Sequence, residues 1–405
     1  MKTSRYASVT LLHSIATGLL IPMLSLLFTT RGFSLSQLAT GILLYSGTTL
    51  ILELPSGVLA DSLGRKRCYL VAEAVKLAGC FFWLQTSSPV LYLACAVMGM
   101  GNAIGSGSFD ALFIDRYLEA NGKESLHTVS TIKTVCETVG YAVGSLAGGA
   151  LLVVGQKLFG REGMCMLPVF VKLVCHGIQI FLVLFTIETD RPVRTSGISV
   201  LKPLKESGSV LHDTPPLVLI LGCVAFTGFL LASVESFWQP RLETLLPDPS
   251  LVWLFGVLGF LYFICCMLGS LAGDWLLKRN LKPAAVFFSG RMASAVVLVL
   301  LSLQTTVFGF FISYMLFYMS LGCAGLAETV LVNQNTPSSV RATILSVQSL
   351  TVQGGAMLAS SLAALTVGSL GIPGYWWIVA GSYLLSSLFG ATVYRKLLPA
   401  KAEAA

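Results

Sequence analysis

Long apolar segments follow one another along nearly the whole chain, and they constrain its fold more than any other feature. A transmembrane helix needs about 20 mainly apolar residues. Charged breaks, or breaks rich in Gly, Pro and Ser, divide the sequence into twelve segments of roughly that length: 6–28, 36–60, 68–86, 89–116, 127–154, 164–186, 215–240, 250–277, 283–303, 305–331, 341–368 and 373–394. We therefore predict an all-α, polytopic membrane protein with twelve transmembrane helices.

Composition excludes the main soluble classes. Of the 405 residues, 55% are hydrophobic and 11% are charged, whereas soluble domains contain about 45–50% and about 25%. A water-soluble enzyme or a nucleic-acid-binding protein needs far more exposed charge. The ten cysteines lie mostly within apolar segments, where they act as small hydrophobic residues. We expect no enzyme activity, no cofactor, no metal site and no nucleic-acid partner.

The positive charges predict the topology. If the N-terminus is cytoplasmic, 18 of the 26 Lys and Arg residues fall on the cytoplasmic side and four on the opposite side, while the other four lie within spans. Cytoplasmic loops carry an excess of Lys and Arg. We expect both termini and the central loop to be cytoplasmic, in a cell membrane, most simply a bacterial inner membrane.

The sequence also divides into two similar halves. Residues 1–186 and 215–405 each hold six predicted spans, and the charged segment 187–214 links them. The segment 57–67, between spans 2 and 3, has a weak counterpart at 269–279, between spans 8 and 9. Two pseudo-symmetric six-helix halves are typical of secondary transporters, which bind substrate near the middle of the membrane.

The segment 57–67, Gly-Val-Leu-Ala-Asp-Ser-Leu-Gly-Arg-Lys-Arg, resembles the signature loop of the major facilitator superfamily. The resemblance extends over essentially the whole chain. In that family the loop latches the two halves in the outward-facing state. By this resemblance the latch residues are Gly57, Asp61, Gly64, Arg65 and Lys66, with Asp274 in the second copy.

A second stretch, in span 5, resembles the antiporter motif of the same family. It contains Gly140, Gly144, Gly148 and Gly149, with Ser145 where the family usually has Pro. Small residues four apart also allow two helices to pack closely. The stretch therefore favours antiport under one interpretation and helix packing alone under the other.

Ionisable residues inside spans are functional or paired by default, because inserting one costs about 2.5–3.5 kcal/mol. Glu73 with Lys76, and Lys133 with Glu137, have the spacing of intrahelical ion pairs. For proton coupling we select Asp110 and Glu137 first, then Glu53, with Lys133 as counter-ion. For His13 the alternatives are helix packing and a proton relay. Glu235 and Trp238 form either an outer gate or a solvated rim. We expect Glu328 to be a structural partner of Arg291 or Arg341.

Aromatic and amide side chains of the predicted spans supply candidates for a substrate cavity, although in any helix bundle such residues also pack against lipid or in the core. The candidates are Asn102, Tyr141, Tyr262, Tyr314, Tyr318, Arg291, Gln348 and Gln353. We predict a monomeric secondary transporter, in contact with membrane lipid, that exports an amphipathic or drug-like small molecule in exchange for protons. A proton-coupled importer or facilitator of a small polar or anionic nutrient, and a lipid flippase-like or receptor protein, are the alternatives.

Overall fold

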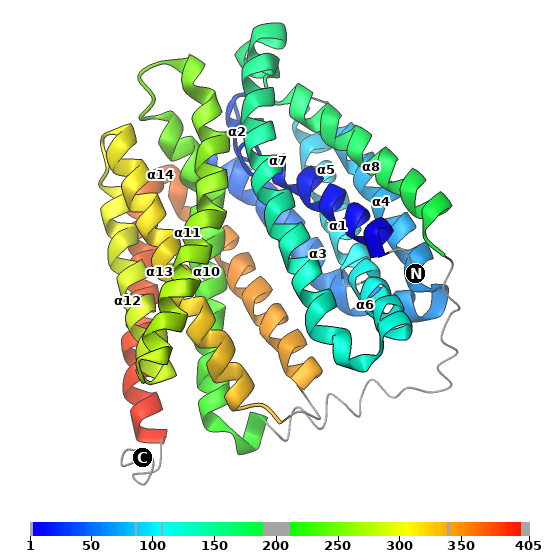
Figure 1. Ribbon diagram of the computed structural model, residues 1–405. Helices are drawn as coiled ribbons and strands as arrows, with labels where there is room; N and C mark the ends of the chain where they lie inside the picture. Colours follow the sequence, from blue (N-terminus) through cyan, green and yellow to red (C-terminus); the bar gives the residue numbers. More distant parts are fainter. Residues whose placement is uncertain (1–2, 86, 107, 189–210, 338–340, 398–405) are drawn as a thin grey trace. The chain divides into compact units, whose positions relative to one another are not determined.

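A computed structural model describes residues 3–85, 87–106, 108–188, 211–337 and 341–397. Side chains are described for these residues except 54, 57–62, 123 and 341–343. Within this part of the chain the regular structure is helical and contains no strand (Figure 1). The linker predicted at 187–214 lies almost wholly outside the described residues.

The helices of the first half match the predicted spans in position, although two spans are broken. They are α1 (Thr3–Gly18), α2 (Leu26–Thr29), α3 (Leu35–Leu63), α4 (Arg65–Trp83), α5 (Ser88–Gly105), α6 (Ser108–Asn121), α7 (Leu126–Gly163) and α8 (Met166–Thr186). The first predicted span is interrupted by turns between α1 and α2, where Pro22 lacks the N–H that a continuous helix requires. The fourth span is divided where α5 ends at Gly105.

The second half follows the same pattern with one long merged helix. Its helices are α10 (Pro215–Glu243), α11 (Trp253–Lys278), α12 (Pro283–Ser302), α13 (Val307–Gln334) and α14 (Arg341–Leu397). α14 contains the last two predicted spans, which meet at Gly371 with a φ of 66°. Gly tolerates this left-handed conformation because it has no Cβ.

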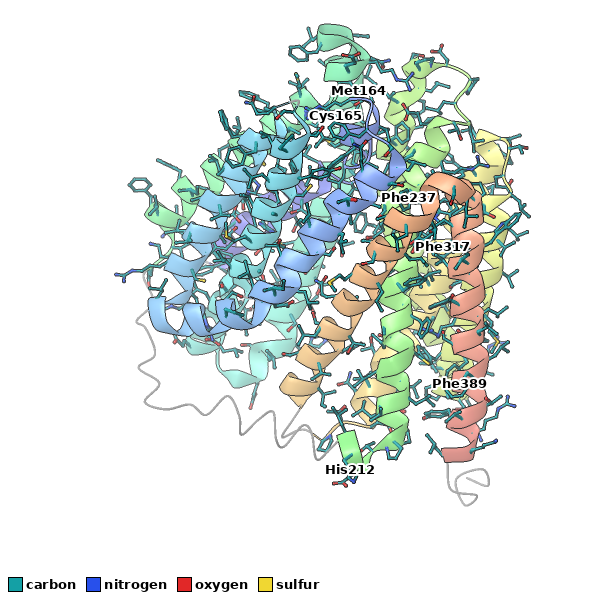
Figure 2. The ribbon with its side chains drawn as sticks, turned by 180° about the vertical axis from the view of Figure 1, so that it is seen from behind. Met164, Cys165, His212, Phe237, Phe317 and Phe389 are labelled. Carbon is teal, nitrogen blue, oxygen red and sulfur yellow. The ribbon has the colours of Figure 1, made fainter. Side chains whose placement is uncertain are left out.

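The apolar helices are long enough for a membrane. Nine helical segments of the described residues are long and apolar enough to cross one; α1 and α4 are not among them, and α14 is counted once. The number twelve therefore stays a prediction. Many large apolar side chains are exposed, such as Leu365 with 82% of its surface. Phe389, which is 65% exposed, is labelled in Figure 2. Such exposure suits helices that face lipid rather than water.

Contacts group the chain into two units, which do not coincide fully with the predicted halves. Unit 1 comprises Met1–Ser196 and Leu246–Phe263, and unit 2 comprises Gly197–Leu245 and Ile264–Ala405. In unit 1, α4 packs against α5 and α8, and α1 packs against α7 and α8. In unit 2, α10 packs against α14, and α12 packs against α13 and α14. The start of α11 belongs to unit 1 because it packs closely against α7, as described below.

Candidate functional site

Unit 1 contains a polar cavity of about 220 Å³ between α1, α4, α5, α6 and α7. Four of the predicted site residues, Asn102, Asp110, Glu137 and Tyr141, line it together. Its other lining residues are Thr10, His13, Tyr69, Lys76, Gly105, Ser106 and Phe109. Ionisable groups from four helices therefore meet around one cavity, although the sequence places them as far as 124 residues apart, from His13 to Glu137.

Lys133 joins the two carboxylates that we selected for proton coupling. Its Nζ atom lies 2.9 Å from Asp110 Oδ2 and 3.0 Å from Glu137 Oε1. The four-residue spacing places Lys133 and Glu137 on one face of α7, and Asp110 comes from the first turn of α6. We call these three residues the triad. One ammonium between two carboxylates leaves the ionised triad with a net charge of −1.

A second charged group surrounds Glu73, whose side chain is completely buried. Lys76 Nζ lies 3.1 Å from Glu73 Oε1, as the three-residue spacing predicted. His176 Nδ1 lies 2.6 Å from Glu73 Oε2, and His13 Nδ1 lies 3.6 Å from Glu73 Oε1. Three nitrogen-bearing side chains from α1, α4 and α8 thus face one carboxylate.

Lys172 adds a second buried cation to this group. It is 3% exposed, its Nζ donates a hydrogen bond of 2.9 Å to the backbone oxygen of Ala16, and it interacts electrostatically with Glu73 and Lys76. We call Glu73, Lys76 and Lys172 the lysine cluster. With two ammonium groups and one carboxylate, the ionised cluster carries a net charge of +1, and through Lys76 it reaches the cavity.

A hydrogen-bond chain fixes His13 at the cavity wall. Gln179 Oε1 accepts from the Tyr69 hydroxyl at 2.8 Å and lies 3.2 Å from His13 Nδ1. An amide oxygen can only accept, so His13 carries its proton on Nδ1 in this arrangement. No local spacing in the sequence indicated Gln179 or His176, because their partners are more than 100 residues away.

Glycines of α5 make room for Lys76. A Cβ atom on Gly101 would collide with the Lys76 side chain, and one on Gly105 would lie 3.3 Å from Lys76 Nζ. Because these glycines are four residues apart on one face of α5, they leave a groove in which the Lys76 side chain extends to the cavity. This spacing is the sequence signal that could have indicated Lys76 as a cavity residue.

Other predicted proton and gate residues lie elsewhere. Glu53, on α3, is not among the residues that line the cavity, and its Oε2 atom is buried without a hydrogen-bond partner in the described part of the chain. Glu235, on α10 of unit 2, is more than a third exposed, whereas Trp238 is buried against Tyr314. Neither of these two belongs to the cavity.

The predicted latch is described only in part. Gly64 joins α3 to α4 with a φ of 88°, Arg65 forms an ion pair with Asp115, and Lys66 Nζ donates to the backbone oxygens of Leu184 and Ile187 at 3.2 and 2.6 Å. In the second copy, Asp274 pairs with Lys278 at 2.6 Å on its own helix. For Gly57 and Asp61 the structure describes the backbone alone, as part of α3.

The glycine stretch of α7 forms two close helix contacts. A Cβ on Gly140 or Gly144 would collide with α1, one on Gly148 with the backbone of Leu19, and one on Gly149 with Gly256 of α11. Ser145, at the position usually occupied by Pro, donates a hydrogen bond of 3.2 Å to the backbone oxygen of Gly256. Packing alone accounts for these small residues, and Tyr141 of the same helix stacks on Phe263 at 5.6 Å, next to Tyr262.

The remaining predicted cavity residues lie in unit 2 and form other contacts. Tyr314 and Tyr318 are buried, with ring centres 4.8 Å apart. Gln348 donates to Glu328 at 2.8 Å, so the carboxylate that we expected to pair with Arg291 or Arg341 is bound by an amide. The Arg341 side chain is outside the described positions, and Gln353 is partly buried on α14.

Arg291 is fully buried and binds hydroxyl groups. Its guanidinium donates to Ser387, Thr227 and Ser386 at 3.1, 2.6 and 3.0 Å. Its centre also lies 4.1 Å from the middle of the Tyr383 ring. No carboxylate lies within ion-pair distance of Arg291 in the described part of unit 2.

Comparison with known proteins decides the family. The family model described as Major Facilitator Superfamily matches residues 6–360. The chain belongs to the Major Facilitator Superfamily. It is therefore a multi-pass membrane protein and a secondary transporter, as the signature loop indicated.

Individual relatives of this superfamily are distant. A curated protein of Bacillus subtilis (strain 168), the uncharacterized MFS-type transporter YxaM, is 24% identical over 265 residues. The match covers 64% of this chain and 63% of that protein, so the chain spans less than two thirds of this relative's length.

Solved structures support the fold over nearly the whole chain. The nucleoside transporter NupG has a TM-score of 0.75 at 16% identity, covering 98% of this chain and 99% of that one. A D-xylose-proton symporter has a TM-score of 0.74 at 12% identity, covering 96% of each chain. An auto-inhibited POT family peptide transporter has a TM-score of 0.76 at 11% identity, covering 98% and 97%. At these identities the likeness shows the superfamily fold alone.

Proposed function

We propose that this superfamily member is a proton-coupled antiporter of small, polar, amine-bearing solutes, and that the triad is its coupling site. The observation that carries the proposal is the bridging position of Lys133, 2.9 and 3.0 Å from two carboxylates that line one cavity. The ionised triad has one negative charge in excess. One proton or one ammonium group of a solute neutralises that charge.

Competition for this single charge supports exchange rather than co-transport. The triad side chains are 23–38% exposed, so solvent compensates their excess negative charge only in part. The triad therefore favours a state in which one positive charge is bound. Once a proton occupies Asp110 or Glu137, the attraction for a second cation is largely lost. A carrier that must release its proton before it accepts the amine operates as an antiporter.

The volume and lining of the cavity favour a smaller solute than we expected from the sequence. Its volume is about 220 Å³, whereas pockets for drug-sized ligands measure about 300–1,000 Å³. Ionisable and hydrogen-bonding side chains make up most of the lining. Both features favour a small polar metabolite over an amphipathic drug.

Proton-coupled import is the second candidate function. A structural relative is a D-xylose-proton symporter, and the Lys76 wall offers a polar surface on a different helix from the triad carboxylates. A solute bound mainly at that wall would leave the triad free to take a proton at the same time. Symport and antiport then differ in the sign of the proton movement that accompanies binding.

Proton release on binding tests both candidates. Purified protein in a weakly buffered solution with a pH-sensitive dye is mixed with small amines, amino acids, nucleosides and sugars at millimolar concentration. Antiport predicts acidification by an amine-bearing compound, and symport predicts alkalinisation. Proteoliposomes with an imposed pH gradient then show whether the same compound accumulates.

Substitution of the triad provides the control for coupling. We expect Asp110→Asn and Glu137→Gln each to abolish the proton release and the gradient-driven accumulation. Glu162→Gln, which changes an exposed carboxylate near the end of α7, should leave both intact. Full gradient-driven accumulation in both triad variants would refute the coupling role.

The topology and assembly predicted from the sequence complete the proposal. We propose a monomer in the cell membrane of a bacterium, surrounded by lipid, with both termini cytoplasmic. In a cysteine-free background, a single cysteine at position 200 should resist an impermeant reagent added to intact cells. A cysteine at position 160 should react with that reagent.

A further inference from the structure

The cavity carries opposite charges on two of its walls. The triad, on α6 and α7, has two carboxylates and one ammonium. The lysine cluster has two ammonium groups and one carboxylate, and its Lys76 lines the cavity from α4. When all six groups are ionised the net charges are −1 and +1. The surroundings are therefore neutral as a whole but polarised across the cavity.

Lys76 retains hydrogen-bonding capacity toward the cavity. An ammonium group has three donors, and the described contact of Lys76 uses one of them, to Glu73. Glu73 is fully buried and is not among the lining residues, whereas Lys76 is. Asn102, adjacent to the glycine on which Lys76 packs, supplies an amide to the same wall.

Lys172 makes this wall more favourable for an anion. Lys172 is buried, and a backbone oxygen is its described hydrogen-bond acceptor. Glu73 must then compensate two ammonium groups while it also accepts from His176. A buried charge is costly unless it is paired. A solute anion beside Lys76 would therefore compensate the excess positive charge of the lysine cluster.

We propose that the solute is a small zwitterion of the amino-acid type, with its ammonium group at the triad and its carboxylate at Lys76. This inference rests on the proposed function for the ammonium end and adds the recognition of the anionic end. Each end of such a solute neutralises the excess charge of one wall. The cavity of about 220 Å³ favours a single amino acid over a longer peptide.

The test compares charge forms of the same molecule. The twenty standard amino acids, β-alanine and γ-aminobutyrate are screened for binding to the purified transporter by isothermal titration calorimetry. Each binding amino acid with an uncharged side chain is then compared with its methyl ester, which keeps only the ammonium charge, and with its N-acetyl form, which keeps only the carboxylate charge. We expect each singly charged form to bind about tenfold or more weakly, because a charge-assisted hydrogen bond is lost at one end.

Substitution of Lys76 assigns the carboxylate end. Lys76→Gln should weaken binding of the free amino acid to the level of its ester and leave binding of the ester within about twofold. Lys76→Arg keeps the charge and should keep the preference for the free amino acid. Lys157→Gln, which changes an exposed lysine of α7, is the matched control and should change neither.

Several outcomes would overturn the inference. One is that no amino acid binds at millimolar concentration. Another is that esters bind wild-type protein as tightly as free amino acids, and a third is that Lys76→Gln weakens both forms equally. Proton release is recorded in the same titrations: selective binding of the zwitterion without proton release refutes the proposed antiport and leaves zwitterion recognition standing.

Discussion

The two units stabilise cations of their helix bundles in different ways. In unit 1, Lys76 and Lys133 each lie within 3.1 Å of a carboxylate oxygen. In unit 2, Arg291 is completely buried, and its guanidinium donates to three hydroxyl groups and lies over the Tyr383 ring. Carboxylates therefore compensate these two lysines of unit 1, whereas hydroxyl dipoles and an aromatic face compensate Arg291. Lys172 of unit 1, which donates to a backbone oxygen, resembles Arg291 in this respect.

This difference separates a responsive site from a fixed one. A carboxylate can gain or lose a proton at accessible pH, and its electrostatic balance with a lysine changes when it does. Serine and threonine hydroxyls do not ionise in this range, so the groups that bind the Arg291 guanidinium keep their charge. Glu328 also interacts electrostatically with Arg291, and Gln348 binds this carboxylate. We infer that Arg291 mainly joins α10, α12 and α14, and the triad of unit 1 remains the proposed proton-dependent site.

The largest expected effect is the loss of Glu73. Glu73→Gln leaves Lys76 and Lys172 buried without a counter-charge, and breaking a buried ion pair costs about 3–5 kcal/mol. We expect a strongly lowered unfolding temperature in detergent and reduced expression. Glu162→Gln, at an exposed carboxylate, is the control and should unfold at the wild-type temperature. A wild-type unfolding temperature for Glu73→Gln would contradict charge pairing as the basis of unit 1.

A smaller effect is expected from the removal of Arg291. The three hydroxyls that bind it also donate to backbone oxygens of their own helices, so Arg291→Met leaves them partly satisfied. We expect a loss of about 1–3 kcal/mol, the cost of unsatisfied polar groups, measured as a modest decrease in unfolding temperature. Proton release on substrate binding should remain. Its loss would show that unit 2 also contributes to coupling.

Part of the difference between the two units could be predicted from the sequence, because some ion-pair partners lie three or four residues apart. The pairs Glu73–Lys76 and Lys133–Glu137 are three and four residues apart, so one helix determines their contact. The apolar segments likewise predicted the helices and the membrane. His176 and Lys172 reach their partners from α8 across more than 100 residues, and the three hydroxyls around Arg291 come from two other helices. No local pattern encodes such contacts, because helix packing brings the partners together.

Helix packing in both units depends on glycine, which provides the third prediction. A Cβ on Gly144 would collide with the backbone oxygen of Ile15, and one on Gly228 would collide with that of Val352 in unit 2. We expect Gly144→Ala and Gly228→Ala each to cost roughly 1–2 kcal/mol, because overpacking outweighs the better helix propensity of Ala. Thermal unfolding in detergent measures the loss.

A glycine with open space is the matched control for packing. Gly177, on α8, has no atom within 4 Å of the position that a Cβ would occupy. Gly177→Ala should therefore leave the unfolding temperature unchanged or raise it slightly. Equal losses at Gly177 and Gly144 would indicate that helix flexibility, and not close approach, explains the requirement for glycine.

The smallest effect on stability is expected at the predicted latch, where stability and transport rate should separate. Arg65 and Asp115 form an ion pair in which both side chains are partly exposed, 31% and 55%. Exposed ion pairs contribute about 0–1 kcal/mol, so Asp115→Asn should scarcely change the unfolding temperature. A latch, however, acts on the equilibrium between two transporter states, and a bias of about 1 kcal/mol changes their ratio roughly fivefold. We therefore expect a several-fold change in the rate of substrate exchange across proteoliposomes, with substrate affinity in detergent unchanged.

Arg116 and Glu119 form a comparable partly exposed pair three residues apart on α6, so Glu119→Gln is the control. If both variants exchange substrate at the wild-type rate, the Arg65–Asp115 pair is only a surface contact and the latch must depend on Gly57 and Asp61.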